Sequence, residues 1–210
     1  MKKLIVLFLS IFCSVLSAKE VTVSVGAGEN WKQNRAPQFA IWLEDSAGNF
    51  VRTLYVTKKA GKQNWIFAPK SGRPESLPVW YYSIASEIKD KNAQSTHEES
   101  FDAVTSATPK GGIVFDISID DDSDYVIKAE FNKSFDYNDF YKKENSGVNG
   151  QPSVVYSARI PANFSKNSGE IKLDFAGLGS LDGTDGIIHI DTAHLTTAKS
   201  IVKLVAIKGK

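Results

Sequence analysis

The sequence is poor in the residue types that most often carry chemistry. Its 210 residues include one cysteine, Cys13, and three histidines. Cys13 lies in the N-terminal leader, so the exported chain would contain no thiol. That absence excludes a disulfide framework, a thiolate metal site and a cysteine nucleophile. The bulky Phe12 stands where lipidation of Cys13 requires a small residue, so we do not expect a lipid anchor.

An excess of charge of one sign is also lacking. The 25 lysines and arginines oppose 24 aspartates and glutamates, and the formal net charge is +1 at pH 7. Loss of Lys2 and Lys3 with the leader changes this charge from +1 to −1. Because the chain is near neutral and has no basic run, we expect neither nucleic acid nor an anionic membrane surface as its partner.

Long hydrophobic runs are absent except at the N-terminus. There, two lysines precede the apolar run Leu4–Phe12, a pattern typical of an export signal and too short for a membrane-spanning helix. The sequence predicts a signal peptide at residues 1–18, cleaved after Ala18 or alternatively after Ser17, and a single domain over residues 19–210. We expect a soluble protein of the bacterial periplasm with no stable membrane insertion.

Alternation of apolar and polar residues, which predicts half-buried strands, is by contrast abundant. Alternating segments separated by turn-forming residues occur at 21–25, 38–44, 50–57, 113–119, 125–131, 154–160, 171–175 and 201–207. Residues 77–88 show helical spacing of apolar residues, with a strand through 79–82 as the alternative. The sequence therefore predicts a mainly β fold, an antiparallel immunoglobulin-like β-sandwich with one short helix.

The clearest hairpin joins residues 38–44 to residues 50–57. Phe39, Ile41 and Leu43 share one face of the first strand. In the second strand, strict alternation places one set of side chains opposite another: Val51, Thr53 and Tyr55 against Arg52, Leu54 and Val56. Because both faces of the hairpin carry apolar side chains, we expect it to be covered on both sides, at least in part.

Signals for a metal site or a hydrolase are weak. Asp120, Asp122 and Asp124 have the spacing that opens a calcium loop, but Tyr125 stands where that loop needs glycine. A solvated turn is the preferred interpretation here and at residues 182–186. No Gly-Xaa-Ser-Xaa-Gly nucleophile elbow occurs, and the histidines are not spaced as a zinc site. We expect neither a resident metal nor a self-sufficient catalytic set.

Aromatic residues are concentrated in the first half of the chain. An aromatic group of this kind is more often part of a core than a stacking platform for a flat ligand. From the sequence alone both interpretations stay open. The residues concerned are Trp31, Trp42, Trp65, Trp80, Tyr81 and Tyr82.

One stretch joins the two halves of this predicted scaffold. Residues 102–112 are small and rich in hydroxyl groups, and Pro109 with the pair Gly111 and Gly112 prevents a helix or a regular strand interior. A polar loop of this kind lies on the surface, where its side chains are accessible. Any chemistry beyond recognition is therefore expected in this stretch.

Four segments of the chain carry a family resemblance. They are Phe-Ala-Ile-Trp-Leu-Glu-Asp from Phe39, Val-Arg-Thr-Leu-Tyr-Val-Thr from Val51, Arg-Pro-Glu-Ser-Leu-Pro-Val-Trp from Arg73, and Asp-Ala-Val-Thr-Ser-Ala-Thr-Pro from Asp102. Together they resemble the predicted periplasmic proteins of domain-of-unknown-function family 2271. The resemblance covers most of the mature chain and implies export to the periplasm, but the family name carries no established activity.

The segment from Asp102 is similar to a second pattern. Asp102, Thr105, Ala107 and Thr108 match the acceptor motif recognised by periplasmic flavin transferases, Asp-Xaa-Xaa-Ser/Thr-Gly-Ala-Thr/Ser. This resemblance implies that Thr108 takes FMN from FAD through a phosphoester bond in a magnesium-dependent reaction, with the other three as recognition positions. Ser106 departs from the motif's glycine, and it would cost stability if the loop needs a positive φ there.

Two functions of different class follow from these observations. The first is an electron carrier with covalent FMN, loaded by a flavin transferase and working with a membrane redox protein, in which the cofactor supplies the chemistry. The second is a non-enzymatic β-sandwich module that binds a ligand or recruits a partner without a cofactor. In that case residues 102–112 are a plain connecting turn. The fold alone does not decide between these two functions.

Overall fold

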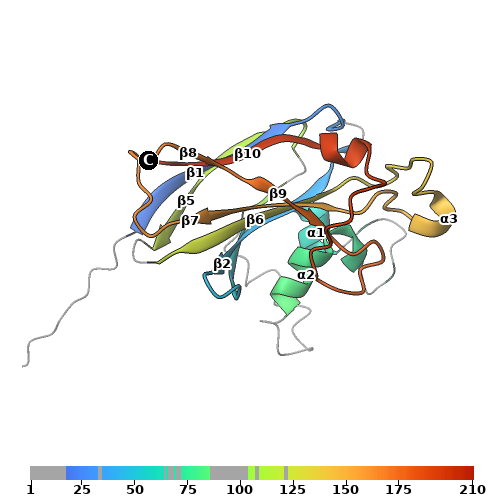
Figure 1. Ribbon diagram of the computed structural model, residues 1–210, viewed down its shortest axis with the longest axis horizontal. Helices are drawn as coiled ribbons and strands as arrows, with labels where there is room; N and C mark the ends of the chain where they lie inside the picture. Colours follow the sequence, from blue (N-terminus) through green and yellow to red (C-terminus); the bar gives the residue numbers. More distant parts are fainter. Residues whose placement is uncertain are drawn as a thin grey trace, which may run out of the picture.

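The protein is a β-sandwich with a small helical layer on one of its outer faces (Figure 1). The expected signal peptide lies outside the part of the chain that the structure describes, apart from Ala18, with which the first strand begins. This computed structural model describes residues 18–32, 35–63, 65, 69, 72–85, 104–106, 109–120 and 123–210.

The smaller sheet has four strands and is antiparallel throughout. In spatial order its strands are β5 (Ile113–Asp120), β1 (Ala18–Ala27), β10 (Val202–Gly209) and β8 (Glu170–Lys172). The central strand β1 pairs along its length with both neighbours, so that Val23 lies opposite Ile207 on one side and Phe115 on the other. The N- and C-terminal strands of the domain thus lie side by side (Figure 1).

The larger sheet has six strands. In spatial order these are β4 (Val104–Ser106), β3 (Phe50–Thr57), β2 (Gln38–Asp45), β6 (Tyr125–Asn132), β7 (Val154–Ile160) and β9 (Asp174–Leu178). All neighbours are antiparallel except β3 and β4, which run parallel. The mainly β sandwich predicted from the sequence is confirmed, with this one parallel pair at the edge of the larger sheet.

The main core lies between the two sheets. It is built from the inward-facing set of each alternating strand, which is why period-2 patterning predicted the strands correctly. Phe39 at the centre of the core has its ring centroid 5.0 Å from that of Tyr55 and 5.1 Å from that of Phe131, both in stacked arrangements. A row of aromatic rings therefore crosses β3, β2 and β6, and ring pairs of this kind stabilise a core beyond the area that they bury.

A second core covers the outer face of the larger sheet. Here Trp42 packs with residues of α1 (Lys58–Lys62) and α2 (Pro78–Ala85). The helix expected near residues 77–88 is confirmed as α2, and the expectation that the hairpin is covered on both faces is also confirmed. Further short helices were not predicted: α1, α3 (Lys143–Ser146) and the 3-10 helices η2 (Pro74–Ser76) and η4 (Thr197–Ser200).

One part of the hairpin prediction is wrong. Strict alternation placed Thr53 and Tyr55 on one face, yet Tyr55 lies in the main core while Thr53 accepts a hydrogen bond from Trp80 of α2. The reason is a register shift between Ile41 and Trp42, opposite this stretch of β3. A bulge inserts an extra residue and breaks the alternation of the strand, so that Leu54 joins Tyr55 in the main core.

No helix in the described ranges has the length and apolar character needed to cross a bilayer.

Candidate functional site

The predicted flavin-acceptor loop connects the two sheets. It leaves the larger sheet at β4, the short edge strand beside β3, and enters the smaller sheet at β5, also an edge strand. Of the predicted site residues, the structure describes the backbone of Thr105, which lies opposite Val56 of β3. Asp102, Ala107 and Thr108 lie outside the described residues.

The position where the acceptor motif has glycine is Ser106. It is the last residue of β4 and pairs with Thr57. Among the described residues, the non-glycine positions with positive φ are Gln63 and Phe135. Ser106 is therefore in a backbone conformation that serine adopts without strain, and the conformational cost considered from the sequence does not arise in this state of the chain.

The far end of the loop is held by a tryptophan. Trp31 Nε1 donates a hydrogen bond to the carbonyl oxygen of Pro109, at 3.2 Å. Directly before β5, the chain passes so close to β1 that a Cβ at Gly112 would collide with the carbonyl oxygen of Val25. Both ends of the stretch 107–108 are thus fixed, one by strand pairing and the other by Trp31.

Trp31 is itself held by the turn between β1 and β2. This turn is attached to η4 through the hydrogen bond from Asn30 N to Ser200 O, at 2.9 Å. Lys133 Nζ donates to the carbonyl oxygen of Asn30 at 2.8 Å and to its Oδ1 at 2.5 Å. Burial lowers the pKa of Lys133 from its usual value; the negative charge of Asp136 opposes this shift, and the positive charges of Lys32 and Arg35 add to it. The buried Lys133 therefore stabilises the turn that carries Trp31.

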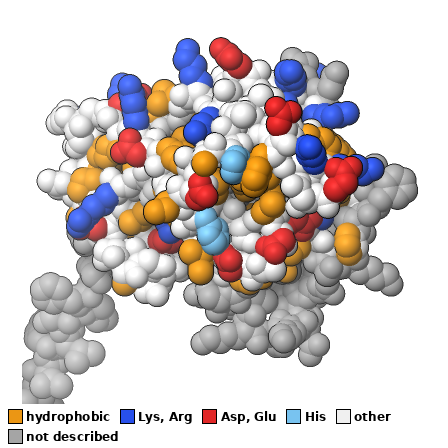
Figure 2. Space-filling view, turned by 45° about the vertical axis from the view of Figure 1, so that its right-hand side comes forward, with side chains coloured by type: hydrophobic (Ala, Val, Ile, Leu, Met, Phe, Trp, Pro, Cys, Tyr) orange, Lys and Arg blue, Asp and Glu red, His pale blue; other side chains and the backbone are white. Residues whose placement is uncertain are grey.

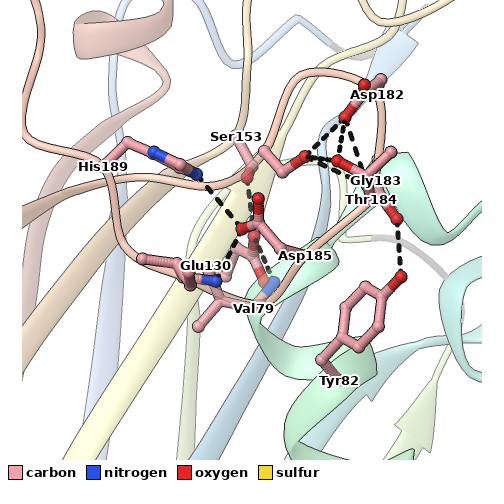
Figure 3. A network of polar contacts seen from close by, with 11 residues as sticks. Val79, Tyr82, Glu130, Ser153, Asp182, Gly183, Thr184, Asp185 and His189 are labelled. Carbon is pink, nitrogen blue, oxygen red and sulfur yellow. Dashed lines mark hydrogen bonds and ion pairs between the residues drawn. The ribbon is translucent and has the colours of Figure 1, made fainter.

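A second polar centre lies under α2. The carboxylate of Glu130, on β6, is fully buried and accepts hydrogen bonds from Trp80 N at 2.8 Å and Ser153 Oγ at 2.6 Å, with Val79 N at 3.3 Å (Figure 3). Burial raises its pKa to about 7, against the lowering effect of these donors. Since no part of this carboxylate reaches solvent, it serves to dock the first turn of the helix and is not placed to act on a substrate.

The turn at residues 182–186 was considered as a weak cation site. Asp182 Oδ1 accepts hydrogen bonds from Ser180 Oγ at 2.7 Å and from Thr184 Oγ1 at 2.8 Å (Figure 3). Asp185 pairs with His189 at 3.1 Å. These oxygens are occupied within the turn, as in an Asx-turn. Within the described part of the chain, no group of three or more His, Cys, Asp or Glu side chains is arranged to hold a metal ion.

The aromatic half of the sequence is mostly core. Trp31, Trp42 and Trp80 are each at most 7% exposed, so they do not form a platform for a flat ligand. Trp65 lies under the guanidinium of Arg73, whose Cζ is 5.1 Å from the ring centroid. The three buried tryptophans therefore serve packing, whereas Tyr82 of the same aromatic group is 39% exposed and its hydroxyl donates a hydrogen bond to Gly183 O at 3.0 Å.

Exposed rings lie at the end of the sandwich near α3. Phe140 is 49% exposed and stacks on His194 with 3.6 Å between ring centroids. Phe135 is 48% exposed. Figure 2 shows hydrophobic side chains and both described histidines on one face of the molecule. These phenylalanines lie between β6 and β7, outside the segments whose alternation predicts strands, so no local pattern pointed to them.

Comparison with known proteins identifies a family for the first part of the domain. The family model of predicted periplasmic proteins, domain-of-unknown-function family 2271, matches residues 18–132. This range runs from β1 to the end of β6 and includes the acceptor loop with both strands that hold it. Searches of curated proteins and of solved structures gave no match to the chain.

Proposed function

This chain belongs to the family of predicted periplasmic proteins of domain-of-unknown-function family 2271, and from that premise we propose that it is an electron carrier of the periplasm with FMN attached to Thr108. One observation carries the proposal. The stretch that contains Thr108 connects two edge strands, and its flanks are fixed by β4 on one side and by the Trp31–Pro109 hydrogen bond on the other.

Such an arrangement suits modification by a second enzyme. A transferase acting on a folded protein needs a short, extended segment at an edge that no neighbouring strand covers. In the described part of the larger sheet, β4 is an outermost strand. Edge strands present unpaired backbone groups that another chain can bind. The backbone of Thr105, a proposed recognition position, is part of this edge.

The attachment reaction is a phosphoryl-type transfer. The Thr108 hydroxyl oxygen attacks the FMN phosphorus of FAD, the bond from that phosphorus to the bridging pyrophosphate oxygen breaks, and AMP leaves. The hydroxyl proton passes to a base of the transferase or to water. Magnesium, held by the transferase with FAD, neutralises the charge that develops on the phosphate oxygens.

The attached cofactor supplies the redox chemistry. Bound FMN would supply one-electron and two-electron redox chemistry between a donor and an acceptor. A membrane redox protein is the proposed partner. The protein itself contributes tether, position and electrostatic environment, so it acts as a carrier and not as a catalyst.

The test is the intact mass of protein exported in a host that contains an active flavin transferase. The expected mass is that of the mature chain plus FMN less water, and the addition is lost in Thr108→Ala. The matched control Thr96→Ala, in the same part of the sequence, keeps the flavin. If wild-type protein stays unmodified while a known acceptor in the same cells is loaded, the carrier proposal fails and the cofactor-free binding module takes its place.

A further inference from the structure

Positive side chains gather around the fixed end of the acceptor loop. Lys32 and Lys110 are exposed, and each directly follows one of the two residues joined by the Trp31–Pro109 hydrogen bond. Arg35, also exposed, is linked to the same turn through the hydrogen bond from its backbone N to Lys32 O, at 3.1 Å. Lys32 and Arg35 therefore belong to the turn that holds the loop, and Lys110 directly follows the residue at which the loop is held.

The carboxylates described in this region form no ion pairs with Lys32, Lys110 or Arg35. Asp136 accepts hydrogen bonds from Thr197 Oγ1 at 2.7 Å, Asn30 Nδ2 at 3.1 Å and Gln151 Nε2 at 3.0 Å. It is thus occupied by neutral donors. Glu29 is exposed on the same turn. Among the described residues, no carboxylate lies within ion-pair distance of the three cationic groups.

An aromatic ring completes the group. Arg35 Cζ lies 5.3 Å from the centroid of the Phe135 ring, within the range of a cation–π contact. Phe135 has φ of 63°, a left-handed conformation that costs a bulky residue on the order of 1–3 kcal/mol. Its backbone N donates to Val148 O at 2.7 Å, which holds this conformation. The Phe135 ring is therefore exposed to solvent, although the backbone conformation at this residue costs energy.

We propose that Arg35 and Phe135 form a platform for the isoalloxazine ring of FMN and that Lys32 and Lys110 bind its phosphate. This inference rests on the proposed function, since the tethered flavin starts next to Pro109. A planar guanidinium over an exposed ring offers a stacking surface for a flat heterocycle. Exposed ammonium groups beside the loop attract the phosphate charge.

The platform also predicts a redox property. Reduction of flavin places negative charge on the isoalloxazine, and nearby cations stabilise that charge. The guanidinium of Arg35 would therefore raise the reduction potential of the bound flavin relative to a flavin free in solution. Its removal is expected to lower the potential.

The first experiment uses the unmodified Thr108→Ala protein and needs no transferase. FMN and riboflavin are titrated separately, and binding is followed by flavin fluorescence. FMN should bind more tightly than riboflavin, and Lys32→Glu or Lys110→Glu should each weaken FMN binding about fivefold, the upper range for an exposed ionic contact. Lys172→Glu, on the distant strand β8, is the matched control and should leave binding unchanged. Equal affinity for FMN and riboflavin would overturn the phosphate assignment.

The second experiment uses the FMN-loaded wild-type protein. Phe135→Asn removes the ring with a residue that tolerates positive φ, and Arg35→Ala removes the guanidinium. Both should increase flavin fluorescence, and Arg35→Ala should lower the reduction potential. Phe140→Ala, which removes another exposed ring, is the control. Fluorescence and potential that equal those of wild type in both variants would overturn the platform, although the carrier proposal would stand.

The two proposals fail separately. If Thr108 is never loaded but Thr108→Ala binds FMN with the expected dependence on Lys32 and Lys110, the flavin site is supported and covalent attachment is rejected. Inorganic phosphate serves as competitor in the titration. If phosphate displaces FMN at concentrations near the dissociation constant of FMN, the site is a general phosphate site and the stacking part of the inference is rejected.

Discussion

Among the described residues, no cationic side chain pairs with the buried carboxylate of Glu130. On the same face of the larger sheet, Lys128 is committed to Glu44 at 2.7 Å. The negative charge is instead met by two backbone N–H groups of α2 and the hydroxyl of Ser153. Desolvation is the larger effect and raises the pKa to about 7. The docking of α2 is therefore linked to the protonation of one side chain.

This linkage gives a prediction with a definite sign. The pKa of Glu130 rises from 4.5 in the unfolded chain to about 7 in the folded protein, so its contribution to stability is fully present below pH 4.5 and is lost as the pH rises through 7. Unfolding by urea should show a free energy roughly 3 kcal/mol lower at pH 8 than at pH 4.5 from this group. In Glu130→Gln the decrease should be absent.

The exposed carboxylates do not interfere with that measurement. Hydrogen bonds lower the pKa values of Asp45, Asp116, Asp124 and Asp182 below 3.8. Their stabilising effect is present above 3.8 and is lost only at lower pH. A decrease in stability between pH 4.5 and 8 that is equally large in Glu130→Gln and in wild type would contradict the role assigned to Glu130.

Ser106 supports another residue-scale prediction. It pairs with Thr57 at the end of β4, next to the attachment position. Ser106→Gly restores the glycine of the acceptor motif and loosens the end of the strand, because glycine has more conformational freedom. We expect faster flavin loading, measured as the modified fraction against time with purified transferase and FAD. Ser83→Gly, in α2 and away from the loop, is the control. A slower rate in Ser106→Gly would show that strand order at this residue assists the transfer.

At the scale of elements, the acceptor loop depends on the turn between β1 and β2. Trp31 joins the two, since its ring packs 5.5 Å from Phe39 in the core and its Nε1 donates to Pro109 O. Trp31 is therefore the side chain through which the core fixes the position of Pro109. The same turn carries Lys32 and Arg35, so loop and platform share a single support.

Trp31→Phe tests this support. The substitution keeps an aromatic ring but removes the donor to Pro109, and it should lower the free energy of unfolding by about 1–2 kcal/mol. Amide hydrogen exchange at residues 110–112 should accelerate. Trp80→Phe is a matched control, because it also removes an indole donor, to Thr53 Oγ1 at 2.9 Å, in the core on the outer face of the larger sheet. Equal exchange at 110–112 in wild type and Trp31→Phe would show that Trp31 does not hold the loop.

The elements were predictable from the sequence where burial alternates strictly. β2, for example, has Phe39, Ile41 and Leu43 in the main core and Trp42 in the helical layer, as expected. β3 was not predictable in this way, because the bulge near Trp42 depends on how two strands pair and leaves no local signal. The other short helices were missed, since a run of three to five residues gives too little periodicity.

The candidate site was predictable only in part. The motif singled out Thr105 and Thr108 from their local sequence. The contact between Trp31 and Pro109 joins residues 78 positions apart, and the contact between Arg35 and Phe135 is also distant in the sequence. Such contacts arise from strand order, which alternation alone does not determine. The platform could therefore be inferred only from the structure.

At the scale of the whole molecule, the two strands that flank the acceptor loop, β4 and β5, are edge strands of the described sheets. The main core holds the two sheets together, and α2 covers the outer face of the larger sheet (Figure 1). A cofactor attached to the acceptor loop and bound to the Arg35–Phe135 platform would stabilise the folded state, so the flavin-loaded protein should unfold at a higher urea concentration than the unloaded protein.

The most direct test of the central claim is the fragment-ion spectrum of the tryptic peptide spanning residues 92–110, taken from protein exported with an active flavin transferase. The account predicts that FMN is found on this peptide and that the fragment ions assign it to Thr108. Flavin on a different residue, or an unmodified peptide beside a loaded reference acceptor, would contradict it.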